Sequence, residues 1–253
     1  MIFILNAFSA KGPATRPVSA PHGYQSPASQ PSTLPNVQTP AATAGNTTVS
    51  NTTSTGNTPP AGTNIIVKNA CLVDLWPAFA ALKPAPFKLG PGEQKVIPLP
   101  NGVPGGRVWG KTGCNTQGTN CAIGDGPVNT LYEFATDKDG TYWYDISLVD
   151  GFSAIGIKTS ILGTPSGPTN GNKYRCGFPS CLPSTSFGKC PSSVQNSKDG
   201  KPASCRNTAG SNSPTSQIFK SICPDAYSFP ADDATSMYQC TGTVSYVVEF
   251  QGC

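Results

Sequence analysis

Carboxylates are the side chains in this sequence whose type and spacing could carry out chemistry. The chain has thirteen acidic residues, and six of them lie between positions 125 and 150: Asp125, Glu133, Asp137, Asp139, Asp145 and Asp150. Asp137 and Asp139 belong to the segment Thr-Asp-Lys-Asp-Gly, which is typical of a hairpin turn. Glu133, Asp145 and Asp150 are therefore the candidates for acid–base chemistry. Solvated acids on a strand face are the commoner explanation of such residues.

Two carboxyl groups are enough for glycoside hydrolysis. The only histidine, His22, lies in a tail segment, so serine and cysteine nucleophiles in the remaining chain lack their usual base. Glycoside hydrolysis needs one protonated carboxyl group as the acid and one ionised carboxylate as the base or nucleophile. Glu133, Asp145 and Asp150 include the carboxyl groups that could form such a pair.

Short strands must position these side chains. From Asn64 onward, runs of Val, Ile, Phe, Tyr and Trp alternate with Pro, Gly and Asn, which is typical of an all-β sandwich. The predicted strands are Asn64–Asn69, Val73–Trp76, Gln94–Leu99, Arg107–Thr112, Leu131–Thr136, Thr141–Leu148 and Ser245–Phe250. Residues 213–222 are predicted to form a helix, with Ser213 as its cap and Pro214 in its first turn.

The alternation of side chains along a strand assigns the candidates to faces of the sheet. Trp143 and Asp145 share one face of their strand. Glu133 projects from a half-buried strand, and Lys111 shares its face with Arg107. One face of these strands therefore belongs to the core, and the other looks outward or into a cleft.

Composition divides the chain into three parts. Residues 1–10 are apolar and end in small residues but lack a basic start, so we interpret them as an imperfect or truncated signal segment. Residues 11–62 are rich in Pro, Ser and Thr with few large apolar residues, which predicts a disordered stalk carrying O-linked sugars, or a plain unmodified linker. Residues 63–253 form the domain, and its Gly- and Pro-rich part from about 163 to 223 is a lobe that disulfides must stabilise.

The ten cysteines favour an oxidising compartment. Two Asn-Thr-Thr sequons, at Asn46 and Asn51, point to N-glycosylation, and both observations favour a secreted protein in the extracellular space or cell wall. A cytosolic metal protein is the alternative, but the sequence contains no Cys-x-x-Cys pair. We expect a monomer without metal or cofactor. Dispersed basic residues argue against nucleic-acid binding, and no apolar run is long enough to span a membrane.

Five sequence blocks resemble the thaumatin-like proteins of the pathogenesis-related, osmotin type. They are Val-Lys-Asn-Ala-Cys near the start of the domain, Gly-Arg-Val-Trp-Gly-Lys-Thr-Gly-Cys at 106–114, Asn-Thr-Leu-Tyr-Glu-Phe at 129–134, Tyr-Asp-Ile-Ser-Leu-Val-Asp-Gly-Phe at 144–152 and Cys-Pro-Asp-Ala-Tyr-Ser-Phe at 223–229. The resemblance spans about residues 64–253 and does not include the stalk. It implies a flattened β-sandwich with a small disulfide-rich lobe and an acidic cleft between them.

The resemblance also implies how the cysteines pair. The implied disulfides are Cys71–Cys253, Cys114–Cys121, Cys176–Cys240, Cys181–Cys223 and Cys190–Cys205. The chain departs from the family in two places. Residues 123–126 read Ile-Gly-Asp-Gly where the family has Thr-Gly-Asp-Cys, which removes a small disulfide loop, and Cys253 lies two residues later than usual.

The family's cleft is lined by one arginine and four acids, which correspond here to Lys111, Glu133, Asp145, Asp150 and Asp225. Lysine keeps the charge of the arginine but lacks the planar fork that grips a carboxylate with two hydrogen bonds. The resemblance suggests linear β-1,3-glucan as the ligand, with Asp145 and Asp225 bonding hydroxyl groups and Tyr227 stacking on a sugar ring.

The cleft that the resemblance implies also suggests catalytic roles. We expect Glu133 to be the acid, because apolar neighbours and the other cleft carboxylates would raise its pKa. Asp150, at the end of its strand, is then the base or nucleophile.

The resemblance is compatible with three classes of function: an enzyme, a binding protein and a structural protein. One hypothesis is a weak endo-β-1,3-glucanase that acts on cell walls in defence or wall remodelling. The alternatives are a glucan-binding or membrane-perturbing antifungal protein without turnover, and a structural wall protein with an idle cleft.

Overall fold

The computed structural model describes residues 62–167, 174–198, 200–207 and 213–253. The predictions for residues 1–10, for all but the last residue of the 11–62 stalk, and for glycosylation at Asn46 and Asn51 lie outside the described residues. Among the described residues, no helix is long and apolar enough to cross a membrane.

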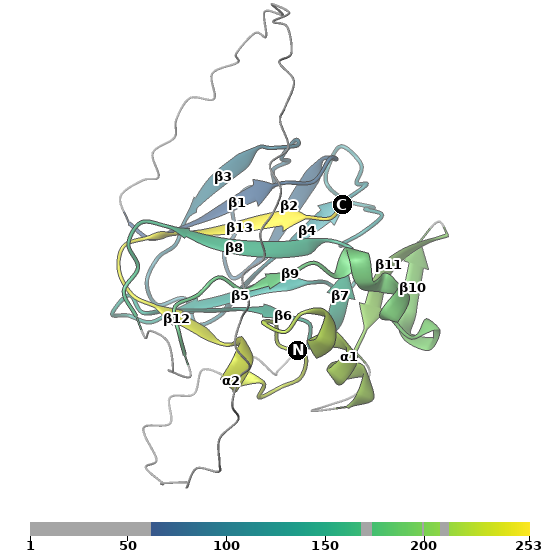
Figure 1. The fold of residues 1–253 in the computed structure, drawn as a ribbon. Coiled ribbons are helices and arrows are strands. Elements are labelled where there is room, and N and C mark those ends of the chain that lie inside the picture. Colours follow the sequence, from purple (N-terminus) through teal and green to yellow (C-terminus); the bar gives the residue numbers. More distant parts are fainter. Residues whose placement is uncertain (1–61, 168–173, 199, 208–212) are drawn as a thin grey trace, which may run out of the picture. The chain divides into compact units, whose positions relative to one another are not determined.

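Two five-stranded sheets form most of the described domain (Figure 1). The first has the order β3-β1-β13-β8-β9 and consists of Gln94–Pro98, Asn64–Asn69, Ser245–Gln251, Gly156–Leu162 and Ser180–Cys181. In this sheet the first and last long strands, β1 and β13, pair in parallel from Asn64 with Ser245 to Asn69 with Phe250. The two ends of the domain are thus joined by main-chain hydrogen bonds.

The second sheet carries the candidate site. Its order is β12-β6-β5-β4-β2, and its strands are Tyr238–Cys240, Tyr142–Ser147, Leu131–Thr136, Gly106–Thr112 and Leu75–Ala80. All its pairs are antiparallel. A third, smaller sheet contains β10 (Gln195–Lys198), β11 (Lys201–Arg206) and β7 (Gly151–Ser153), with β11 in the middle.

Aromatic rings fill the space between the two large sheets. Tyr142 of β6 stacks on Tyr246 of β13 with ring centroids 3.7 Å apart, and its hydroxyl lies 2.8 Å from that of Tyr132. Phe134 is fully buried, and its ring lies against Gly106, where a Cβ atom would be only 2.2 Å from the ring. The core therefore requires glycine at position 106, and it fixes which faces of β4, β5 and β6 look away from the core.

Helical segments are short. The helix α1 covers Pro214–Ile222, and the Ser213 hydroxyl accepts a hydrogen bond from the Ser216 amide, as the capping prediction required. Buried Phe219 of α1 packs edge-on against Phe152, with centroids 5.0 Å apart. The others are α2 (Asp233–Ser236) and the 3₁₀ segments η2 (Pro183–Lys189) and η3 (Ser192–Val194).

All five disulfides implied by the family resemblance are present. They are Cys71–Cys253, Cys114–Cys121, Cys176–Cys240, Cys181–Cys223 and Cys190–Cys205, and no cysteine is free. The first closes a separation of 182 residues, and the last three tie residues 176–223 together and to β12.

The strand predictions need two corrections. The predicted strand Val73–Trp76 is wrong in its limits, because β2 begins at Leu75 and continues through Pro77 to Ala80. Proline is tolerated there because β2 is an edge strand of its sheet. In addition, β7, β8, β9, β10, β11 and β12 were not predicted. The lobe contains the β10–β11 hairpin in addition to its disulfides.

Candidate functional site

Three neighbouring strands place one cation and two acids side by side. In the register of the second sheet, Arg107 of β4 pairs with Glu133 of β5, and Glu133 pairs with Asp145 of β6. Their side chains share the sheet face opposite buried Tyr132 and Tyr144, because neighbouring residues of a strand point to opposite faces. The Arg107 Nε atom lies 2.8 Å from the Glu133 Oε1 atom, which makes an ion pair. We call these residues the Arg107–Glu133–Asp145 row.

Burial dominates the electrostatics of this row. It raises the pKa of Glu133, whose side chain is 12% exposed, although the Arg107 charge and a hydrogen bond with Ser147 oppose the shift. Asp145 is only 4% exposed, and burial followed by the Glu133 charge raises its pKa well above the ordinary value. The Asp145 Oδ1 atom has no hydrogen-bond partner among the described residues. Asp145 is thus the carboxyl group of the row that favours the protonated form.

Asp150 lies close enough to Glu133 for its charge to act on it, next to the start of β7 in the third sheet. It is exposed in the turn between β6 and β7, and its carbonyl accepts a hydrogen bond from the Asn207 amide. The next residue, Gly151, has φ +123°, and a Cβ atom there would lie 2.1 Å from the Cys205 carbonyl oxygen. Glycine is therefore required to bring this turn close to β11. The Asp150 charge adds to the rise in the Glu133 pKa.

A loop from the C-terminal part of the chain runs beside Asp145. Tyr227 donates its amide to Ile146 and accepts from Leu148, so it runs along β6. Its hydroxyl donates to the Asp233 Oδ1 atom over 2.8 Å, and the Asp233 charge further raises the pKa of Asp145. The sequence analysis did not include Asp233, and nothing local to its segment signals this contact.

Two tryptophans flank the row on the same face. Trp109 lies two residues beyond Arg107 on β4, and Trp143 lies two residues before Asp145 on β6. Both are half-buried, and their indole nitrogens donate to the Gly124 carbonyl and to Asp137, respectively. Among the described residues, no group of three His, Cys, Asp or Glu side chains is placed to hold a metal ion. The face thus combines carboxyl groups, a guanidinium and aromatic rings.

Comparison with known proteins gives the family. The profile of the Thaumatin family matches residues 69–252. This chain belongs to the thaumatin family. It is 33% identical to pathogenesis-related thaumatin-like protein 3.7 of Cryptomeria japonica, over 73% of this chain and 86% of that protein. It is 30% identical to pathogenesis-related protein 5 of Arabidopsis thaliana, over 74% of this chain and 90% of that protein.

Among solved structures, a thaumatin-like xylanase inhibitor aligns with 74% of this chain and 97% of its own length. Its TM-score is 0.41 and its sequence identity is 14%.

The cation beside Glu133 in this thaumatin-family chain is Arg107. Lys111, which the family motif placed in the cleft, instead pairs with Asp125 over 3.3 Å and donates to the Gly118 carbonyl. Glu133 thus has a guanidinium partner in Arg107, although the family's arginine position holds Lys111. Strand register decides this point, since Arg107 and not Lys111 pairs with Glu133 across β4 and β5.

The structure places two other predicted binding residues, Tyr227 and Asp225, along β6 and near Tyr238 of β12, respectively. Tyr227 is 6% exposed and bonded to Asp233, so its ring does not offer a free face for stacking. Asp225 is half-buried, and after burial its charge is the main cause that raises the pKa of Tyr238 to about 12. Asp225 thus lies next to β12 and is not a direct neighbour of Glu133 in the register.

Proposed function

We propose that this thaumatin-family protein is secreted and binds β-1,3-glucan of cell walls through the Arg107–Glu133–Asp145 row, in defence or wall remodelling. Secretion is supported by five disulfides and the absence of a free cysteine among the described residues. A role in defence is supported by the pathogenesis-related proteins to which the chain is similar.

The observation that carries the proposal is the Arg107–Glu133 ion pair on a sheet face that also presents Trp109 and Trp143. A sugar ring offers hydroxyl groups that donate and accept hydrogen bonds, and C–H faces that pack on aromatic rings. Ionised partners make the stronger hydrogen bonds to such hydroxyls. Arg107 donates to acceptor oxygens, Glu133 and exposed Asp150 accept from hydroxyl groups, and the indole rings supply apolar contact.

Slow hydrolysis is the second candidate, and the electrostatics of Glu133 favour it. Burial and the Asp150 charge raise the pKa of Glu133, as a general acid requires. Asp150 is exposed to water and can act as the base or nucleophile. In this proposal Asp145 is a positioning residue, because its carboxyl group is buried and lies beside Glu133 on the neighbouring strand.

Binding of the protein to insoluble β-1,3-glucan and its hydrolysis of soluble β-1,3-glucan should be measured together. The full chain is incubated with insoluble β-1,3-glucan, and bound protein is quantified. Reducing ends released from laminarin are measured in parallel. Glu133→Gln and Asp150→Asn are the test variants. Glu249→Gln is the matched control, since Glu249 is also a strand glutamate in an ion pair, with Lys68 on the other sheet.

We expect Glu133→Gln to weaken retention about tenfold, the usual effect of losing one charge-assisted hydrogen bond. Asp150→Asn should weaken retention less, because Asp150 is exposed. Any reducing-sugar release should be lost in both variants. Retention without sugar release identifies a binding module, and no retention of the wild-type chain would overturn the proposed function.

A further inference from the structure

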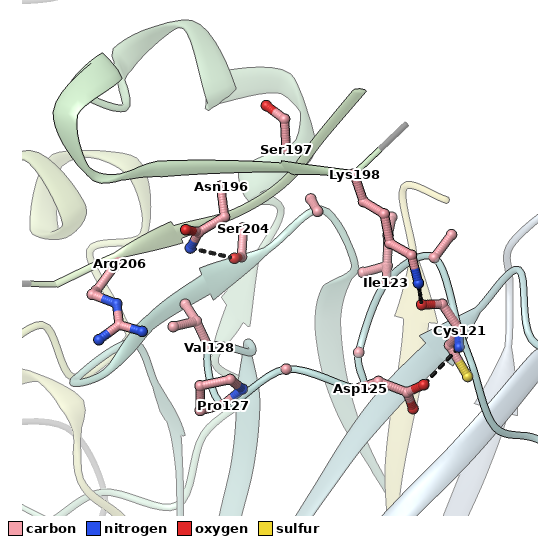
Figure 2. A pocket seen from close by; sticks show the side chains of 14 residues that line it. Cys121, Ile123, Asp125, Pro127, Val128, Asn196, Ser197, Lys198, Ser204 and Arg206 are labelled. Carbon is pink, nitrogen blue, oxygen red and sulfur yellow. Dashed lines mark hydrogen bonds between the residues drawn. The ribbon is translucent and has the colours of Figure 1, made fainter. Parts of the chain in front are cut away.

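A pocket lies outside the Arg107–Glu133–Asp145 row, and two of its three charged side chains are basic. It has a volume of about 330 Å³ and lies between the loop 121–128 and the β10–β11 hairpin (Figure 2). Arg206 lies at one end, and Lys198 and Asp125 lie at the other. The volume is at the lower end of the range for small-molecule sites.

Both walls of this pocket are fixed before any ligand arrives. The Cys114–Cys121 disulfide anchors the loop, and the Asp125 carboxylate accepts from the Cys121 amide over 2.6 Å. The hairpin is anchored by the Cys190–Cys205 disulfide and by the pairing of β11 with β7. Lys198 reaches across the pocket and donates to the Cys121 carbonyl. A rigid site loses little conformational entropy on binding.

Arg206 is the charged side chain of the pocket that remains free to bind a ligand. Asp125 already accepts from Lys111 and from the Cys121 amide, and Lys198 already donates across the walls. Arg206 is exposed, and its guanidinium makes no hydrogen bond or ion pair with the described residues. An unpaired guanidinium is a planar fork of five donors. It can hold a carboxylate with two parallel hydrogen bonds.

The remaining lining suits a sugar ring better than a simple anion. Apolar atoms of Pro127 and Val128 face hydroxyl and amide groups of Asn196 and Ser204, which are hydrogen-bonded to each other. A phosphate dianion would meet the Asp125 carboxylate in the same pocket, which disfavours it more than a monoanion. We propose that this pocket binds a uronic acid residue of an acidic polysaccharide, with Arg206 holding the sugar carboxylate.

Gly126 provides a steric test of the site. It lines the pocket, a Cβ atom added there would meet no atom within 4 Å, and its φ is not positive. Gly126→Tyr therefore adds a bulky side chain at the pocket wall without backbone strain. Gly188→Tyr is the matched control, because Gly188 is equally open and does not line the pocket. Arg206→Gln removes the fork, and Lys201→Gln removes a charge from the same strand outside the pocket.

The experiment is calorimetric titration of the full chain with trigalacturonate, its methyl ester and inorganic phosphate. We expect trigalacturonate to bind and the neutral ester and phosphate not to bind. Arg206→Gln and Gly126→Tyr should each weaken binding at least about tenfold, since a bidentate charged pair is worth one power of ten or more. Lys201→Gln and Gly188→Tyr should leave binding unchanged.

Three results would overturn the proposal. They are no binding of trigalacturonate, equal binding of the ester or of phosphate, and equal losses in Arg206→Gln and Lys201→Gln. The last would identify general surface charge as the cause. Retention on β-1,3-glucan should not change in Arg206→Gln, so this test fails or succeeds separately from the proposed function.

Discussion

Asp145 is the residue of the row whose ionised form would destabilise the folded state most. Asp145 is almost fully buried, and its Oδ1 atom has no hydrogen-bond partner among the described residues. An ionised carboxylate in that position would lack the compensation that buried charges require. The raised pKa of Asp145 reduces this penalty, because a protonated carboxyl group carries no charge next to Glu133.

This state of Asp145 predicts a pH dependence of stability. Its folded pKa is raised, so above the unfolded pKa of about 3.9 the folded state holds a proton that the unfolded state has lost. The free energy of unfolding should therefore fall as pH rises from about 4, by up to about 1.4 kcal/mol per pH unit until Asp145 ionises. Asp145→Asn should remove most of this slope. Urea unfolding of both proteins between pH 3.5 and 7 measures it, and equal slopes would contradict the expectation.

The ion pair between Arg107 and Glu133 leads to a second prediction, which concerns the pKa of Glu133. Its charge lowers the pKa of Glu133 against the rise caused by burial. In Arg107→Gln the Glu133 pKa should therefore rise further, whereas in Lys111→Gln it should stay unchanged, because Lys111 pairs with Asp125. Carboxyl ¹³C chemical shifts of Glu133 followed through a pH titration report the pKa directly. A larger change in Lys111→Gln would mean that Lys111 is the cation of the row.

Among the secondary-structure elements, α1 is the helix that packs on the aromatic core, through Phe219 and Phe152. Its start depends on the Ser213 hydroxyl, which accepts from the Ser216 amide. Ser213→Ala should therefore reduce the free energy of unfolding by about 1 kcal/mol, as for other N-caps. Ser221→Ala is the control, because the Ser221 hydroxyl only donates to a carbonyl on the exposed side of the same helix. Urea unfolding of both variants measures the difference, and equal losses would argue against the cap.

Strands rich in large apolar residues were predictable from sequence. The strands β1, β5, β6 and β13 were expected within one or two residues of their observed ends, because apolar residues mark their buried face. By contrast, β10 reads Gln-Asn-Ser-Lys and has no apolar signal. Its structure depends on a disulfide and on pairing with β11, which in turn pairs with β7, and these are contacts between distant segments.

The candidate site was likewise only partly predictable from the sequence. Alternation placed Glu133 and Asp145 on outward faces, but the partner of Glu133 depends on strand register, which favours Arg107 over Lys111. The contact of Asp233 with Tyr227 depends on a loop returning along β6, for which no local pattern exists.

Two links join the N- and C-terminal ends of the domain. They are the parallel pairing of β1 with β13 and the Cys71–Cys253 disulfide. The disulfide joins residues 182 apart and so restricts nearly the entire unfolded domain. The Cys114–Cys121 disulfide joins residues only 7 apart. Loop-closure entropy predicts that the long bridge contributes about 5 kcal/mol and the short one about 2 kcal/mol.

Paired substitutions test this difference. Cys71→Ala with Cys253→Ala should lower the free energy of unfolding about twice as much as Cys114→Ala with Cys121→Ala. The β1–β13 ladder should keep the native ends together in the first variant, because its main-chain bonds do not involve the cysteines. Urea unfolding with the other disulfides intact gives both values, and circular dichroism checks that the native sheets are retained. Equal losses in the two variants would show that native contacts around each bridge, and not the length of chain it closes, determine its effect.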